Sequence, residues 1–125
     1  QNNPALKYDE RWLNFFEVDI NQLVNKDEVI FLDITADWCA TCQFNKVNVL
    51  NSNKIIKLFE ENNILLVRAD WTRPNKKVNV FLEKYKRFGI PFNAFFSKSF
   101  PNGVLLSELL SEKEILEAIN KIQYE

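Results

Sequence analysis

The fold is decided by residues 29–42, which read VIFLDITADWCATC. The first half of this stretch, Val29–Thr35, is an apolar run rich in β-branched residues. Such a run predicts a central strand that is buried on both faces, because a half-exposed strand would alternate apolar and polar residues. Asp33 is the one charged residue in this strand, which makes it a candidate functional residue.

The second half of the stretch leads into a helix. From Cys39 onward, apolar residues recur at a three-residue spacing that is typical of one helix face, and these are Phe44, Val47 and Leu50. The two cysteines, Cys39 and Cys42, therefore lie where a buried strand passes into a helix.

The rest of the chain alternates strands and helices, so we expect an α/β fold with a central mixed sheet flanked by helices. Residues 1–14 are expected to be an N-terminal lead-in or linker, and residues 15–125 to form one domain. The patterns predict, in chain order, a short strand near Phe15–Val18, a helical turn near Ile20–Asn25, a helix at Lys54–Asn62, a strand at Ile64–Ala69, a helix at Asn75–Lys86, strands at Pro91–Phe96 and Val104–Leu106, and a last helix that begins at the capping box Ser111–Glu114.

Composition places the chain among single-domain globular proteins. Its 125 residues leave no room for a second core, and 46% hydrophobic with 26% charged residues is ordinary for a folded domain. The net charge of −1, with both signs interspersed, argues against a nucleic-acid partner. No apolar run approaches the roughly 20 residues that span a bilayer. We therefore expect a soluble, monomeric domain.

The C-x-x-C motif of Cys39 and Cys42 predicts thiol chemistry. A thiolate attacks a disulfide, and the unpaired N–H groups at a helix N-terminus stabilise negative charge on sulfur. Cys39 is expected at the first helical turn, with Cys42 one turn further in and less exposed. We therefore expect Cys39 to attack a partner disulfide and Cys42 to resolve the mixed disulfide, so that a redox-active disulfide serves in place of a cofactor.

Two other interpretations of the cysteines remain open. They could be small apolar core residues or an inert structural disulfide, in which case the domain would be a non-catalytic binding module. A closed zinc site needs four ligands, and the chain has two cysteines and no histidine. A metal-carrying domain would therefore need ligands from another chain, and no metal site is predicted.

Asp33 is expected to point inward, near the sulfur of Cys42. Burial penalises the charged form of a carboxylate, so Asp33 is expected to exchange protons with Cys42, as general base during resolution and as general acid in reverse. The alternative is a solvated aspartate at a strand edge, without a role.

Ile90, Pro91 and Trp38 are candidate substrate-binding residues. Pro91 opens a predicted strand, where its ring nitrogen donates no ladder hydrogen bond. A cis Ile90–Pro91 bond would leave the Ile90 backbone free to pair with a substrate strand beside Cys39, whereas a trans proline would only begin the strand. Trp38 is expected at the rim of the same surface.

Three motifs follow one another along the chain: TADWCATCQ at residues 35–43, ADWT at residues 69–72 and FGIP at residues 88–91. With these motifs the chain, from about Val29 to Ile122, resembles the C-terminal thioredoxin-like domain of DsbD-type thiol:disulfide interchange proteins. The resemblance implies a thioredoxin fold and assigns four roles by position: Cys39 is the attacking cysteine, Cys42 the resolving cysteine, Asp33 the buried acid and Pro91 the cis proline.

The resemblance also implies partners and a location. In that family the domain lies in the bacterial periplasm as part of an inner-membrane protein, receives electrons from a membrane-embedded domain and passes them to periplasmic proteins with disulfides. The chain departs from the pattern at Lys46, where some members carry an additional acid. A cytochrome c maturation reductase of the same fold is the alternative.

The dipeptide between the cysteines predicts the direction of electron flow. Reduction potentials of such pairs run from about −270 mV for thioredoxin to about −120 mV for DsbA. A cation beside the second cysteine would stabilise the thiolate and favour an oxidant, and Ala40-Thr41 supplies none. We therefore expect a protein-disulfide reductase.

Overall fold

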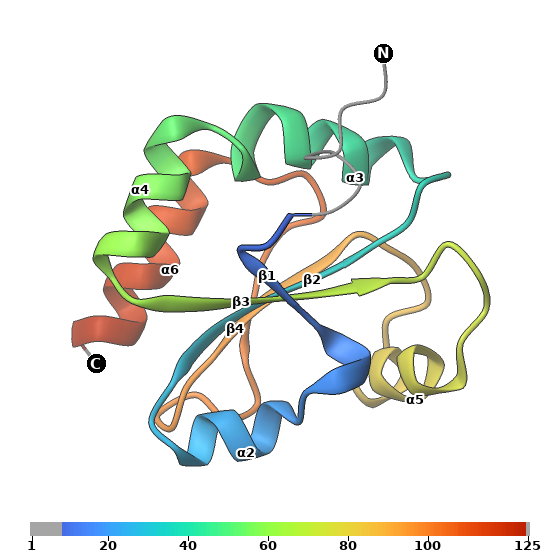
Figure 1. Ribbon diagram of the computed structural model, residues 1–125, viewed down its shortest axis with the longest axis horizontal. Coiled ribbons are helices and arrows are strands. Elements are labelled where there is room, and N and C mark those ends of the chain that lie inside the picture. The colour runs from blue at the N-terminus through green and yellow to red at the C-terminus, as the bar shows by residue number, and fades with distance from the viewer. Residues whose placement is uncertain (1–8, 125) are drawn as a thin grey trace.

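A computed structural model describes residues 9–124 of the chain. Five strands form one mixed sheet in the order β1-β3-β2-β4-β5 (Figure 1). β2 pairs in parallel with β3 and antiparallel with β4, so the strand that precedes the cysteines lies at the centre of the sheet, as predicted. The strands are β1 (Trp12–Asn14), β2 (Val29–Thr35), β3 (Ile64–Asp70), β4 (Phe92–Phe96) and β5 (Val104–Leu105).

Helices cover both faces of this sheet (Figure 1). One layer contains α2 (Ile20–Asn25) and α5 (Lys76–Lys84), and their apolar residues pack with one side of β2. The other layer contains α3 (Ala40–Asn45), the π-helical segment η2 (Lys46–Leu50), α4 (Asn53–Glu61) and α6 (Glu112–Tyr124). The α/β architecture with a mixed central sheet is thus confirmed.

The side chains of β2 alternate between the two layers. Ile30, Leu32 and Ile34 pack into the core under α2 and α5, whereas Phe31 packs into the core under α4 and α6. Successive side chains of a strand point to opposite faces, so Asp33 lies on the same face as Phe31. The acid of the central strand is therefore on the side of the sheet that α3 covers.

The first strand differs from its prediction. The sheet begins with Trp12–Asn14, which pairs in parallel with β3, and Phe15–Glu17 forms a 3-10 turn (η1) instead of the predicted strand. The Asn14 side chain explains the turn, because it accepts a hydrogen bond from the Phe16 backbone N–H at 2.9 Å. Strand β1 falls within the range expected as a lead-in, and residues 1–8 of that range lie outside the described residues.

The apolar face predicted for the helix after the cysteines is wrong in part. Phe44 and Val47 are 48% and 65% exposed, whereas Val49 and Leu50 are buried. The buried residues of α3 and η2 are Cys42, Asn45, Val49 and Leu50, and they recur at the i, i+3, i+7, i+8 spacing of an ordinary helix face. A three-residue spacing therefore does not describe the buried face of this helix.

The structure contains the predicted turn before Val104 and the predicted Ser111 cap of the last helix, but Glu114 has a different partner from the one that a capping box gives it. The hairpin turn ends at Gly103, whose φ of 91° suits glycine and where a Cβ would lie 2.8 Å from the Phe96 ring. At α6, the Ser111 hydroxyl accepts from the Glu114 N–H at 3.1 Å, as a capping box requires. The Glu114 carboxylate accepts instead from the backbone and hydroxyl of Ser107, so it ties the helix to the preceding loop.

Candidate active site

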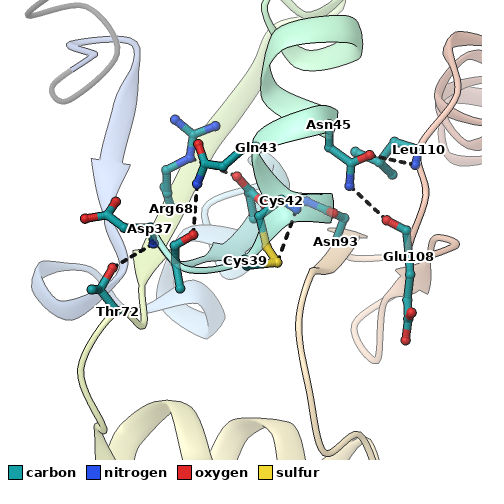
Figure 2. Close-up of a disulfide and its surroundings, with 12 residues drawn as sticks. Asp37, Cys39, Cys42, Gln43, Asn45, Arg68, Thr72, Asn93, Glu108 and Leu110 are labelled. Carbon is teal, nitrogen blue, oxygen red and sulfur yellow. Dashed lines mark hydrogen bonds and ion pairs between the residues drawn. A yellow bond between two sulfur atoms is a disulfide. The ribbon is translucent and has the colours of Figure 1, made fainter. Parts of the chain in front are cut away.

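Cys39 and Cys42 form a disulfide at the start of α3 (Figure 2). Cys39 is the N-cap residue, and its Sγ accepts a hydrogen bond from the Cys42 backbone N–H at 3.2 Å. Cys39 is 7% exposed and Cys42 is 2% exposed, so Cys39 is the more accessible sulfur-bearing residue. The cysteines thus lie between a strand and a helix, and Cys39 is more accessible than Cys42, as the sequence predicts.

The segment between β2 and α3 is held from two sides. The Ala36 carbonyl accepts from the Cys39 N–H at 3.2 Å and from the Gln43 side-chain amide at 2.9 Å. Thr72, which follows β3, accepts from the Asp37 N–H through its hydroxyl at 2.9 Å (Figure 2) and from the Trp38 indole through its carbonyl at 3.1 Å. These bonds fix the residues that immediately precede Cys39.

Asn45 fixes the other side of α3. Its amide nitrogen donates to the Glu108 carbonyl at 2.8 Å, and its amide oxygen accepts from the Leu110 N–H at 3.0 Å (Figure 2). The Asn45 side chain is buried and both of its polar ends are bonded, so the helix is tied to the loop that leads into α6. The sequence interpretation missed this residue, because asparagine in a helix more often reads as a neutral surface position.

Asp33 is buried, and both of its carboxylate oxygens have partners. Arg68 Nε donates to Oδ2 at 2.9 Å, and Asn93 Nδ2 donates to Oδ1 at 2.8 Å. The two partners come from the strands on either side, because Asp33 stands opposite Arg68 in β3 and opposite Asn93 in β4. The Arg68 guanidinium also lies over the Trp12 ring, 3.8 Å from its centroid.

This arrangement changes the expectation for Asp33 in one respect. Its 3% exposure contradicts the alternative of a solvated strand-edge residue. The carboxylate is not isolated in an apolar strand, however, because an arginine and an amide compensate the loss of water. Arg68 is a charged residue inside the apolar run of β3, just as Asp33 is inside that of β2. Two charges of opposite sign in two buried strands are the feature of the sequence that could have indicated this ion pair.

The Ile90–Pro91 peptide bond is cis. Ile90 packs against the buried cluster formed by Ala36, Cys39 and Cys42, and Pro91 is buried. Among the described residues, Ile90 makes none of the backbone–backbone hydrogen bonds found outside the helices and strands. Ile90 therefore lies beside the disulfide, and Pro91 follows it in the chain.

Large aromatic side chains are exposed around this site. Trp38 is 62% exposed, and its ring centroid lies 6.4 Å from that of Trp71. Phe88, two residues before Ile90 and the first residue of the FGIP motif, is 88% exposed, and the sequence analysis assigns it no role. Trp38 is thus an exposed neighbour of Cys39 in the sequence, and its role in substrate binding stays a prediction.

Lys46 is a half-buried cation one helical turn beyond Cys42. Burial lowers the pKa of its ammonium group from the ordinary value of 10.5, and the positive charge of Arg68 lowers this pKa further. The carboxylates of Asp33, Asp37 and Asp70 act in the opposite direction but do not cancel the shift. The charge on Lys46 is therefore less favourable in the folded chain than in water.

Residues 9–124 show neither a metal-binding cluster nor a membrane-spanning helix. They contain no group of three or more His, Cys, Asp or Glu side chains arranged to hold a metal ion. Within the same range, every helix is too short or too polar to traverse a bilayer.

With the fold and site in place, the comparison with known proteins identifies the family. A family model described as thioredoxin-like matches residues 11–98, and the chain belongs to this family. It is similar to the thiol:disulfide interchange protein DsbD of Campylobacter jejuni, with 25% identity over 115 residues, and to DsbD of Haemophilus influenzae, with 26% identity over 85 residues. The first alignment covers 92% of this chain but 19% of that protein, so the chain spans about a fifth of the length of this relative.

Solved structures confirm the thioredoxin fold. The oxidised C-terminal domain of DsbD from Neisseria meningitidis matches with a TM-score of 0.63 and 19% identity, covering 96% of this chain and 95% of that chain. A thioredoxin from Thermus thermophilus matches with a TM-score of 0.67 and 16% identity, covering 91% and 87%. The predicted resemblance to DsbD C-terminal domains is confirmed, and this similarity together with the C-x-x-C disulfide supports a thiol:disulfide oxidoreductase.

Proposed function

We propose that the domain reduces protein disulfides through Cys39 and Cys42. The observation that carries this proposal is the disulfide at the start of α3, with Cys39 as its more accessible member and a backbone N–H directed at the Cys39 sulfur. A hydrogen bond from that N–H favours the thiolate over the thiol, because it stabilises negative charge on sulfur. Cys39 is then the nucleophile.

The exchange proceeds in two balanced steps. The Cys39 thiolate attacks one sulfur of the partner disulfide, a mixed disulfide forms, and the other partner sulfur leaves as a thiolate that takes up a proton. Cys42 then loses its proton, attacks the Cys39 sulfur and releases the second partner thiol. The partner gains two electrons and two protons, and the domain ends with the Cys39–Cys42 disulfide.

Asp33 is proposed as the group that receives the Cys42 proton. Its support is its place on the α3 side of the sheet and the two fixed bonds, from Arg68 and Asn93, that hold its carboxylate. A carboxylate that is held in this way acts as a general base without having to reorient. Ile90 is proposed to offer its backbone to the partner segment, with Pro91 and Trp38 shaping the surface on which the segment lies.

The reducing direction and the partners are also proposals. Ala40-Thr41 places no cation between the cysteines, which favours the disulfide over the thiolate and gives a low reduction potential. Similarity to DsbD supports a periplasmic location as a domain of an inner-membrane protein, with an upstream membrane-embedded domain that supplies the electrons.

The test combines a measurement of the reduction potential with the trapping of a mixed disulfide. Equilibration with dithiothreitol buffers should give a reduction potential closer to about −270 mV than to about −120 mV. The Cys42→Ala variant should accumulate a mixed disulfide with an added protein disulfide such as insulin, whereas Cys39→Ser should not. A potential near the DsbA value would contradict the reducing role. Equal insulin reduction by the wild type and Cys39→Ser would instead favour an inert structural disulfide.

A further inference from the structure

Phe88 is a large apolar side chain that folding leaves in water. It is 88% exposed, more than any other large hydrophobic side chain among the described residues. Leu116 on α6, by comparison, is 40% exposed. Isolated exposed apolar residues are common, so exposure alone assigns no role. The position of Phe88 is what makes it informative.

Phe88 lies on the loop that contacts the disulfide. Ile90, two residues later, packs against Cys39 and Cys42. Two residues of extended chain span at most about 7 Å, so the backbone of Phe88 cannot be far from that contact. Between them, a Cβ on Gly89 would meet no atom within 4 Å, so the loop has open space beside it. Phe88 therefore belongs to the loop beside the disulfide, and its ring is not packed into the domain.

A partner must cover this part of the surface during exchange. Cys39 is only 7% exposed, so a partner sulfur can reach it only if the chain on either side of that sulfur lies against the surrounding rim. Trp38 belongs to this rim because it directly precedes Cys39 in the chain. Phe88 belongs to it because it lies two residues before Ile90, which packs against the cysteine cluster. An apolar side chain near the partner cysteine would be removed from water by these rings, and a polar one would not benefit.

We propose that Phe88 is a specificity-determining residue, selecting partner proteins that carry a large apolar side chain close to the cysteine that Cys39 attacks. The inference rests on the proposed function and deepens it by naming the chemistry of the partner segment. Phe88 makes and breaks no bond. It acts on the docking that precedes the attack of Cys39 on the disulfide.

The test compares two disulfide peptides and one small disulfide. The peptides are homodimers of the same length that differ only two positions before the cysteine, where one has Phe and the other Ser. The small disulfide is bis(2-hydroxyethyl) disulfide, which is too short to reach the rim. Reduced domain is mixed with each, and the second-order rate constant of its oxidation is measured from the change in intrinsic tryptophan fluorescence.

We expect the wild type to react with the Phe peptide about three to ten times faster than with the Ser peptide, a factor that corresponds to one aromatic contact. Phe88→Ala should remove most of this preference, and Phe88→Leu should keep part of it. Leu116→Ala is the matched control, an exposed apolar side chain on α6, and should keep the full preference. All variants should react with the small disulfide at the wild-type rate.

Two results would overturn the inference: equal rates of the wild type with both peptides, or an unchanged preference in Phe88→Ala. Thermal unfolding checks that each variant is folded, and the exposure of Phe88 predicts little change. Failure of the proposed function gives a different result. In that case the wild type would show no Cys39-dependent reaction with the small disulfide.

Discussion

Arg68 and Asp33 stand opposite each other in neighbouring parallel strands, and Arg68 Nε donates to the Asp33 carboxylate at 2.9 Å. The side chains are 19% and 4% exposed, so this ion pair lies largely out of water beneath the helix that carries the disulfide. The pair connects β2 with β3, and it also holds the carboxylate that is proposed to receive the Cys42 proton.

Replacement of Arg68 should therefore destabilise the domain. Arg68→Met removes one of two donors to a buried carboxylate, and loss of one partner of a buried ion pair costs about 3 kcal/mol. Lys57→Met is the control, because Lys57 and Glu61 form an exposed pair worth less than about 0.5 kcal/mol. Urea unfolding measures both. Similar losses for the two variants would contradict a special contribution of the Arg68–Asp33 pair.

Replacement of Asp33 should slow one step of the exchange. If Asp33 receives the Cys42 proton as proposed, Asp33→Asn should slow resolution about 100-fold and leave the attack by Cys39 nearly unchanged. Rapid acid quenching should then show a mixed disulfide that accumulates and decays slowly. Asp37→Asn removes an exposed carboxylate two residues before Cys39 and should not cause accumulation. A uniform slowing of both steps by Asp33→Asn would indicate a structural effect only.

Lys46 should make stability depend on alkaline pH. Burial lowers its pKa in the folded state, so at neutral pH the charged ammonium opposes folding. The penalty is complete below the folded pKa, decreases as the pH rises, and is absent above the unfolded value of 10.5, where both states are neutral. Lys46→Met should thus be more stable than the wild type at pH 7, and the advantage should shrink toward pH 10.5 in urea unfolding. Lys46→Arg stays charged throughout and should show no recovery. A constant advantage of Lys46→Met at every pH would contradict this origin.

Thr72 should control the order of the segment before Cys39. Thr72→Val removes the hydroxyl that accepts from the Asp37 N–H and donates to the Asp70 carboxylate, a loss of about 1 kcal/mol. The Asp37 amide should then exchange its hydrogen faster, as measured by NMR. Thr72→Ser keeps the hydroxyl and should retain most of the protection. Equal amide exchange in the two variants would show that the hydroxyl does not fix this segment.

The features that could be predicted from sequence are those that local patterns encode. The buried strand Val29–Thr35 has its predicted bounds, because a run of apolar residues that only Asp33 interrupts distinguishes a central strand. The position of Cys39 at the helix start follows from the same run, since the strand has to end before the helix begins. The turn at Gly103 was likewise encoded by its own residues.

The features that escaped prediction depend on contacts between segments that are distant in the sequence. Asp33 meets Arg68 and Asn93 only through the register of three strands, which no local pattern specifies. Phe44 is exposed because the helix turns Cys42 and Asn45 inward, and the burial of the polar Asn45 depends on its hydrogen bonds to the distant Glu108 and Leu110. The exposure of Phe88 depends on a loop whose packing the sequence does not encode.

Asn45 has a consequence for how the domain is made. Two of the groups that hold the segment around the cysteines, Thr72 through Asp37 and Leu110 through Asn45, follow the cysteines in the chain. During synthesis the two thiols leave the ribosome well before the segments that enclose them. The pair is therefore open to oxidation by the surroundings until the last third of the chain has emerged, and only the finished domain decides which disulfides reach Cys39.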